Sequence, residues 1–509
     1  MFNTYNFDFI LQTKWYLTVS FSTVIVYIKK SEGFAMNWEQ LLCEKRQSKS
    51  KSKNSKDLRN EFQKDYHRII CSASFRRLQD KTQVFPLDKS DFVRTRLTHS
   101  LEVSSFAKSL GQTAFQYLID NDIDKELTPE IKDKACSILE CAGLLHDIGN
   151  PPFGHFGEDS IRNWFESNMA KIEFNGTTLD EYLDEQMKND LLHFEGNAQA
   201  LRLLTKLHYL VDENGMHLTY ALLNTLIKYP VSSCEIDKHS GDIKTKKMGY
   251  YFAEKELFDD ITSSTGAVDC RYPLTYLLEA ADDIAYLTAD IEDAVKKGFL
   301  SYNQLLEELR SEKCIFECAD ENERKNYTNM ISLLETKYQN AKAKKIANPE
   351  LNAVQNWVIS VQGNLLYCAS YGFTKNYRSI MDGTFTKEVL AISHGNAMAK
   401  ALGKIAYEYV FRSKPILKME ISAGKIINFL LDNFIPAAVH YDTKLKLSPM
   451  EDRLMSIISE NYREIYSIYS ADKNDKEKLY LRLLLVTDFV CGMTDSYAKR
   501  IYQELSGIE

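Results

Sequence analysis

The residues best suited to chemistry are an adjacent histidine and aspartate, His146 and Asp147, in the stretch LLHDIGNPPFGH. At a predicted helix end, a neutral imidazole and a carboxylate can both reach one divalent ion. The helix stop after them leaves one side of that ion open. Two more candidates lie in segments predicted to be apolar helices, His99 in RTRLTHSLEV and Asp282 in LLEAADDIAYLTADIEDA. Buried polar groups need partners, and one metal ion satisfies all four side chains.

Two imidazoles and two carboxylates form a mixed nitrogen and oxygen donor set. Such a set suits Mg, Mn, Fe, Co or Ni better than an ion that prefers thiolates. A lone His-Asp pair is weak evidence, because such pairs arise by chance and usually lie on a surface. The context of the pair makes the signal specific, and we expect a divalent metal, with Mg or Mn as the first choice.

A second pair, His155 and Glu158, follows three residues after the prolines of the same stretch. Residues three apart share a helix face if the chain enters a helix after Pro152. A histidine whose second nitrogen is held by a carboxylate is oriented and can move a proton. A structural histidine at a helix start is the alternative.

The elements that must position these side chains are predicted to be helices, because apolar residues recur at helical spacing around each of them. Gly149 followed by two prolines predicts a firm helix stop. Pro and Gly are scarce, at 10 and 21 residues in 509, which suits long helices better than many strands. The predicted helical ranges are 91–119, 131–147, 153–164, 191–210, 218–229, 273–297, 301–309 and 385–505.

Two segments are predicted to depart from helix. Residues 231–250 are polar and rich in turn formers, which favours a loop or a small hairpin. Within 351–383, Val358, Ile359 and Val361 are the best strand candidates. We therefore expect an all-α fold, mainly helical, in which a small β hairpin or short strands are possible.

Three regions are expected along the chain. Residues 1–57 form an N-terminal extension and a basic linker with poor order, 58–300 the catalytic core, and 301–509 a helical region that packs on the core and contributes to oligomer and pocket. The apolar run at 15–28 is shorter than the roughly 20 residues that a membrane span needs. We expect the working protein to begin near Met36, without stable membrane association.

Bulk composition narrows the function classes. With 44% hydrophobic and 26% charged residues, the chain has the composition of a globular protein rather than a disordered one. The net charge of −8 provides no overall basic field for nonspecific nucleic-acid binding. The ten cysteines lack paired spacing, which predicts reduced thiols in a cytoplasmic protein rather than a disulfide framework.

The order His, His-Asp, Asp resembles the HD phosphohydrolase superfamily, and the surrounding motifs resemble its dGTPase branch. The motifs are SFRRLQDKTQVFPL (74–87), RTRLTHSLEV (94–103), GLLHDIGNPPFGHFGE (143–158), HFEGNAQALRLL (193–204), EAADDIAYLTADIEDAV (279–295) and VTDFVCGMTDSYA (486–498). The likeness covers roughly residues 58 to 505. The long central motif is highly specific, whereas a bare HD pair would not be.

The resemblance implies roles for individual residues. The implied metal ligands are His99, His146, Asp147 and Asp282, and the implied catalytic pair is His155 with Glu158. Asp282 is preferred over Asp283 because Tyr286 and Asp290 then share its helix face. The implied substrate contacts are Gln83, Asn197, Lys228, Tyr229, Tyr286 and Asp290. Gln83 and Asn197 would bind base or sugar, Lys228 would neutralise phosphate, and the tyrosines would pack against deoxyribose.

The reaction implied by the resemblance is hydrolysis of dGTP, or of several dNTPs, to the deoxynucleoside and inorganic triphosphate. One alternative is another HD nucleotidase or phosphodiesterase with the same metal set. Another is a nucleic-acid-binding regulator with a vestigial site, suggested by the basic, serine-rich residues 45–56. The family also suggests a homo-oligomer, often a hexamer, and single-stranded DNA as an effector.

Overall fold

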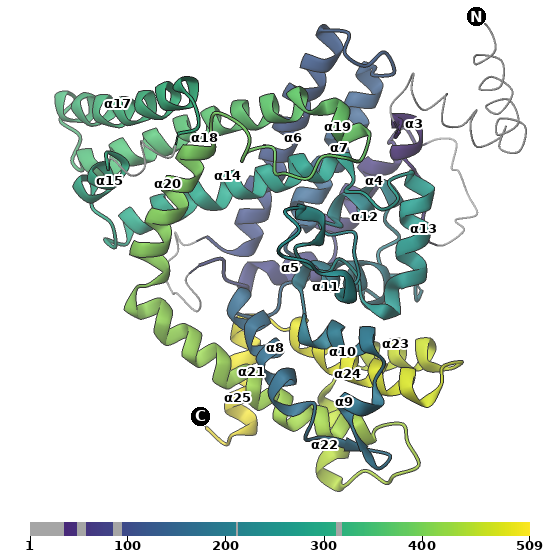
Figure 1. The fold of residues 1–509 in the computed structure, drawn as a ribbon. Helices are drawn as coiled ribbons and strands as arrows, with labels where there is room; N and C mark the ends of the chain where they lie inside the picture. Colours follow the sequence, from purple (N-terminus) through teal and green to yellow (C-terminus); the bar gives the residue numbers. More distant parts are fainter. Residues whose placement is uncertain (1–34, 48–56, 85–93, 210–211, 312–317, 509) are drawn as a thin grey trace, which may run out of the picture.

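The computed structural model describes residues 35–47, 57–84, 94–209, 212–311 and 318–508. Long helices pack on one another through two hydrophobic clusters, one in the upper half of Figure 1 and one around the C-terminal helices in the lower half. The only strands among the described residues form a two-stranded hairpin, β1 (Glu173–Phe174) and β2 (Thr177–Thr178), with Glu173 opposite Thr178. The all-α prediction is confirmed.

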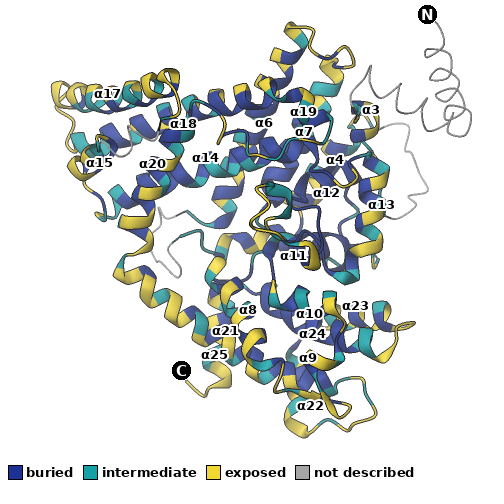
Figure 2. Cartoon of the chain, viewed as in Figure 1, coloured by how far each residue is buried: buried dark blue, intermediate teal, exposed yellow. Residues whose placement is uncertain are grey.

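The first cluster is built around helices that cross one another at the centre of the molecule. The long helix α6 packs against α7, α14 and α18, and α7 packs against α4 and α12. Buried residues are densest on α12 and α14 among these helices, as the dark blue in Figure 2 indicates. Their bounds are α4 (Glu61–Ile70), α6 (Arg96–Asp120), α7 (Pro129–Leu145), α12 (Tyr220–Leu226), α14 (Pro273–Lys296) and α18 (Pro349–Lys375).

Smaller or peripheral helices surround this centre. They are α3 (Trp38–Leu41), α5 (Ala73–Arg77), α11 (Gly196–Arg202), α13 (Lys255–Thr265), α15 (Tyr302–Leu309), α17 (Glu321–Ala343), α19 (Tyr377–Met381) and α20 (Asn396–Ala406). Single-turn segments are η1 (Leu78–Asp80), η2 (Leu203–Leu207), η3 (Ser233–Glu235), η4 (Ile243–Thr245), η5 (Phe252–Glu254) and η6 (Tyr407–Phe411).

The second cluster joins the helix that follows the HD motif to the C-terminal helices. Helix α21 packs against α8, α24, α22 and α25, so segments far apart in sequence lie side by side (Figure 1). The bounds are α8 (His155–Asn168), α9 (Leu179–Tyr182), α10 (Glu185–Leu192), α21 (Lys414–His440), α22 (Pro449–Ile457), α23 (Glu460–Ser470), α24 (Asp475–Cys491) and α25 (Asp495–Leu505).

The strand prediction at Val358, Ile359 and Val361 is wrong, because these residues lie inside α18. Their β-branched side chains suggested a strand. However, the buried residues of α18 include Val354, Val358, Val361 and Leu365, which recur every three to four residues as on one face of a helix. Burial of that face outweighs the weaker local preference.

The polar segment 231–250 contains the short turns η3 and η4 and no strand, which agrees with its prediction as a loop. The hairpin lies earlier, at 173–178. Part of the expected N-terminal extension is folded: Trp38 is fully buried, and its indole N–H donates to the Tyr377 hydroxyl at 2.7 Å. The apolar run at 15–28 lies outside the described residues. No helix in the described part of the chain is long and apolar enough to cross a membrane.

Candidate metal centre and active site

Two helices bring the histidines together. His99 lies in the first turn of α6, and His146 caps the C-terminal end of α7. The helices cross closely at Gly143, where an added Cβ atom would lie 2.4 Å from the Ser104 Cα atom. The backbone contact therefore requires glycine at this position, and it draws the two imidazoles to a ring-centroid separation of 5.1 Å.

Asp147 and Asp282 complete the cluster. His99, His146 and Asp147 each offer a ligand atom within 4.8 Å of the others. Asp282, on α14, places Oδ1 at 3.2 Å from His99 Nε2 and 3.3 Å from His146 Nε2. Helices α6 and α14 and the C-terminal end of α7 thus bring the two imidazoles and two carboxylates to one point.

The donor chemistry of this cluster fits a divalent cation. His146 Nδ1 lies 2.8 Å from the Gly143 carbonyl oxygen, so this nitrogen carries a proton and Nε2 is left to face the two carboxylates. Nε2 is buried and has no hydrogen-bond partner among the described residues. A histidine held in this way through its other nitrogen is the usual arrangement of a metal ligand.

The electrostatics of the cluster also favour a cation. Burial alone would lower the pKa of His146, but the carboxylates of Asp147 and Asp282 outweigh it and raise this pKa to about 10. Burial opposes ionisation of both carboxylates too. Arg96 and His146 nevertheless hold the pKa of Asp147 well below its usual range, and His146 with Lys228 does the same for Asp282. The carboxylates remain charged, as metal ligands must.

Arg96 is a site residue that the sequence analysis did not single out. Its Nη1 donates to Asp147 Oδ2 at 2.5 Å, and its side chain is 5% exposed. The residue lies three positions before His99, on the same face of α6. This spacing of three residues from His99 is the sequence signal that could have identified Arg96. Arg96 orients Asp147 and supplies positive charge at the edge of the cluster.

Lys228 lies against the cluster, held by a carboxylate that sequence reasoning also missed. Its ammonium donates to Asp282 Oδ2 at 3.2 Å and pairs with Glu279 Oε1 at 2.7 Å. Arg271 donates to Glu279 Oε2 at 2.8 Å and to the Lys228 carbonyl oxygen at 2.9 Å. The Arg271 guanidinium also lies 5.9 Å from the centre of the buried Tyr229 ring. Lys228 is therefore fixed beside Asp282, and Tyr229 lies beside Arg271.

His155 and Glu158 form the predicted pair at the start of α8. His155 Nδ1 lies 2.9 Å from Glu158 Oε2, with the imidazole side chain 76% exposed and Glu158 1% exposed. The hydrogen bond to Glu158 raises the pKa of His155 above its usual value. Burial disfavours the charged form of Glu158, but the bond to His155 prevails and lowers the pKa of this carboxyl.

The buried carboxylate of Glu158 also connects this pair to α11. Its Oε1 accepts the Gly196 backbone N–H at 2.8 Å. Asn197, the next residue, donates its side-chain amide to Glu195 at 2.7 Å, and Lys247 pairs with the same Glu195 carboxylate at 2.8 Å. Asn197 is therefore oriented by a carboxylate and a lysine next to the His155 turn.

The other residues predicted to contact the substrate are Gln83, Tyr286 and Asp290. The Gln83 side-chain oxygen is buried and has no hydrogen-bond partner among the described residues. Tyr286 is half-buried one turn after Asp282, and its electrostatic neighbours are Asp283, Asp282 and Asp290. Asp290 is buried two turns along, roughly 12 Å from Asp282 at the rise of a helix. No described contact joins Asp290 to the metal-ligand cluster.

Comparison with known proteins identifies the family of the chain. The HD domain model matches residues 96–197. A deoxyguanosinetriphosphate triphosphohydrolase-like protein of Listeria innocua is 47% identical over 93% of this chain and its own full length. A protein of the same name from Synechocystis is 33% identical over 93% of this chain and 100% of its own length. A deoxyguanosinetriphosphate triphosphohydrolase of Yersinia enterocolitica is 31% identical over 90% of this chain and 96% of its own length. The chain belongs to the HD-domain family of deoxyguanosinetriphosphate triphosphohydrolase-like proteins.

Proposed function

We propose that this protein hydrolyses deoxynucleoside triphosphates, with dGTP as the first candidate, to the deoxynucleoside and inorganic triphosphate. The main support is the cluster of His99, His146, Asp147 and Asp282, with buried imidazoles, half-buried carboxylates and Lys228 on one side. The printed names of the relatives from Listeria innocua and Yersinia enterocolitica supply the nucleotide class. The guanine preference rests on those names alone.

His99, His146, Asp147 and Asp282 would hold the divalent ion, with Mg or Mn as the first choice and Fe, Co or Ni as alternatives. Such an ion supplies Lewis acidity toward a phosphoryl oxygen and lowers the pKa of a water. Arg96 keeps Asp147 charged and oriented through its bond of 2.5 Å. Lys228 lies against Asp282, where an ammonium group can neutralise triphosphate charge.

His155 would handle a proton at the departing 5′-oxygen, with Glu158 as its orienting partner. Glu158 holds Nδ1 of the exposed imidazole, and no residue that the structure describes hydrogen-bonds to its Nε2. A raised pKa keeps a larger share of His155 protonated near neutral pH, which suits a general acid. Water then enters at the α-phosphorus and the bond to the 5′-oxygen breaks.

The remaining predicted contacts would bind the nucleoside. Gln83 and Asn197 would hydrogen-bond base or sugar, and Tyr229, Tyr286 and Asp290 would line the deoxyribose. The buried Gln83 oxygen without a partner among the described residues supports a ligand contact there. A tyrosine packed near the 2′ position would exclude a ribose hydroxyl by bulk.

A product assay tests this function. The purified chain, with Mn or Mg, would be offered each dNTP and GTP, and the products would be separated by ion exchange. We expect deoxyguanosine and inorganic triphosphate from dGTP, and no product from the matched His146→Ala variant. Turnover of several dNTPs would discard only the guanine preference. Release of orthophosphate or pyrophosphate would indicate that the chain catalyses a different HD-type reaction. No turnover with or without single-stranded DNA would contradict the proposal.

The proposed cellular setting is a cytoplasmic homo-oligomer with single-stranded DNA as an effector. The hexamer is the first candidate state, and light scattering on the purified chain measures it. A change in dGTP turnover on addition of single-stranded DNA would support the effector, and an unchanged rate would remove it.

A further inference from the structure

The turn that leads into His155 has an unusual backbone. Phe153 has a φ of 64°, and Gly154 follows with a φ of 61° and a ψ of −129°. A side chain other than glycine is rarely found in the left-handed region, so Phe153 is strained there. Such a conformation persists only where surrounding contacts impose it. The orientation of His155 therefore depends on whatever holds this turn.

One contact that holds the turn comes from the far end of the chain. Asp495, in the first turn of α25, accepts the Phe153 backbone N–H on Oδ1 at 2.8 Å. The same carboxylate accepts the Thr82 backbone N–H at 3.0 Å and the Thr82 hydroxyl at 2.6 Å, both on Oδ2. Asp495 is 1% exposed. Its two oxygens join the His155 turn to the segment that precedes Gln83.

A second buried group links the same three segments. The Lys81 ammonium donates to the Asn150 carbonyl oxygen at 2.6 Å and to the Cys491 carbonyl oxygen at 2.7 Å. Lys81 is 3% exposed, and its neighbour Thr82 pairs with Thr95 in an isolated β-bridge. Between them, Lys81 and Asp495 attach the loop after the HD motif to the corner between α24 and α25.

We propose that Asp495 is a positioning residue for His155, holding the strained Phe153–Gly154 turn and Thr82 in the arrangement that places the imidazole for proton transfer. This role rests on the proposed function for the part that concerns catalysis. The holding of the turn is independent of any substrate. The aspartate at the start of α25 thereby gives the C-terminal helix a function at the site although it touches no reacting atom.

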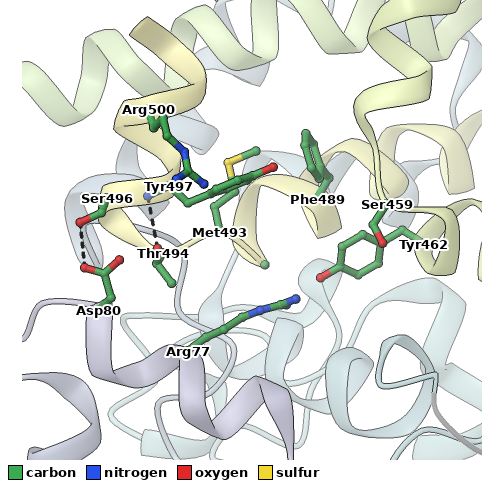
Figure 3. Close-up of a pocket in the computed structure, with 11 residues that line it drawn as sticks. Arg77, Asp80, Ser459, Tyr462, Phe489, Met493, Thr494, Ser496, Tyr497 and Arg500 are labelled. Carbon is green, nitrogen blue, oxygen red and sulfur yellow. Dashed lines mark hydrogen bonds between the residues drawn. The ribbon is translucent and has the colours of Figure 1, made fainter. Parts of the chain in front are cut away.

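The outer side of the same corner offers a matched control. Ser496 donates its hydroxyl to Asp80 at 2.9 Å, at the edge of a surface cavity of about 370 Å³ that Arg77, Tyr462 and Arg500 help to line (Figure 3). This bond joins the same two chain segments as the Asp495–Thr82 bond but lies on the exposed side. Ser496→Ala therefore removes a bond between these segments without touching the turn.

The test compares Asp495→Asn with Ser496→Ala in the full chain. An asparagine cannot accept from Phe153 and Thr82 backbone N–H groups on both of its terminal atoms, because one of them is an NH₂ group. One donor is left unpaired. We expect amide exchange at Phe153 and Gly154 to rise about tenfold, in line with the loss of one buried hydrogen bond. Ser496→Ala should leave this exchange unchanged.

Activity supplies the second readout. Asp495→Asn should lower kcat for dGTP about tenfold or more, a part of the ~10²–10⁴-fold that proton transfer contributes, with Mn affinity unchanged by calorimetry. In a His155→Ala background the same substitution should have almost no further effect, because its influence passes through His155. Thr82→Val removes only the hydroxyl bond to Asp495, so it should also lower kcat and raise the amide exchange at the turn, but by less. This variant replaces Asp495→Asn in the test if Asp495→Asn does not fold.

The outcomes separate the two proposals. Unchanged exchange at the turn in Asp495→Asn, and in Thr82→Val if that variant must stand in, would overturn the positioning role whatever the activity. An equal loss of kcat with and without His155 would also overturn it, because a general loss of structure acts on both backgrounds alike. If the unmodified chain hydrolyses no nucleotide, the proposed function fails, while faster exchange at the turn still upholds the part played by Asp495 in holding it.

Discussion

Replacing Glu158 by glutamine tests the proton-transfer pair with little change in shape. Glu158 accepts two hydrogen bonds, from His155 Nδ1 at 2.9 Å and from the Gly196 N–H at 2.8 Å. The glutamine carbonyl can keep the bond to Gly196, which places its NH₂ group against His155. An NH₂ group is a donor only. The glutamine NH₂ group therefore favours the neutral His155 tautomer whose Nδ1 carries no proton. It disfavours the imidazolium form, in which both ring nitrogens are protonated.

The expected magnitude follows from these contacts. The bond to Glu158 is the largest cause of the raised pKa of His155, and its loss returns this pKa toward the ordinary value or below. Each unit lost removes about tenfold of the protonated form at higher pH. The imidazole is 76% exposed, so water screens the charge effect and the geometric effect dominates. We expect kcat to fall roughly 10- to 100-fold, less than the ~10²–10⁴-fold expected for His155→Ala.

The sign of the pH dependence is fixed by the direction of the pKa shift. A raised pKa means that His155 stays protonated to a higher pH, and activity that needs the acid form is lost as pH rises through that pKa. Glu158→Gln lowers the pKa, so the alkaline limb of the kcat profile should move to lower pH. Steady-state release of inorganic triphosphate from dGTP across neutral and alkaline pH measures both effects.

A matched control removes the same charge from the same helix. Glu166 is exposed on α8, and Glu166→Gln should leave both kcat and the pH profile unchanged. An alkaline limb that does not move in Glu158→Gln, or a rate equal to that of the unmodified chain, would refute the assignment of His155 as the acid oriented by Glu158.

The other predictions concern the metal cluster, the buried ion pair between Arg202 on α11 and Asp488 on α24, and the choice between deoxyribose and ribose. His146→Ala should abolish turnover and lower Mn affinity by calorimetry while far-UV circular dichroism stays helical; activity at the original rate would remove the cluster as the active site. Arg202→Met should lower the free energy of unfolding by about 3–5 kcal/mol, seen as a lower Tm, because the buried Asp488 loses its cationic partner at 2.7 Å, whereas Glu254 keeps Lys206 at 3.0 Å; an unchanged Tm would contradict this. Tyr286→Ala should narrow the difference in kcat/KM between dGTP and GTP, and an unchanged ratio would place the exclusion of ribose elsewhere.

The helical nature of the chain and the location of its main chemistry follow from local sequence. Helix spacing and the scarcity of Pro and Gly predict the all-α fold, because an amphipathic helix carries its own periodic signal. The HD motif and the pair His155 and Glu158 are also local, since each lies within one turn of helix. The strand prediction within 351–383 failed where β-branched residues coincide with a buried helix face, and only the packing partner of that face decides between the two.

Only the tertiary structure reveals the groups that orient these residues. Arg96 is near His99 in sequence, but its bond to Asp147 depends on how α6 crosses α7. Asp488 and Asp495 lie more than 280 residues from their partners Arg202 and Phe153. A carboxylate in a C-terminal helix gives no local sign of which backbone N–H or guanidinium it will meet, because hydrogen-bond partners are fixed by distance in space rather than along the chain. The sequence by itself therefore determines which side chains are the candidates for the chemistry, and the packing of distant helices decides how those side chains are held.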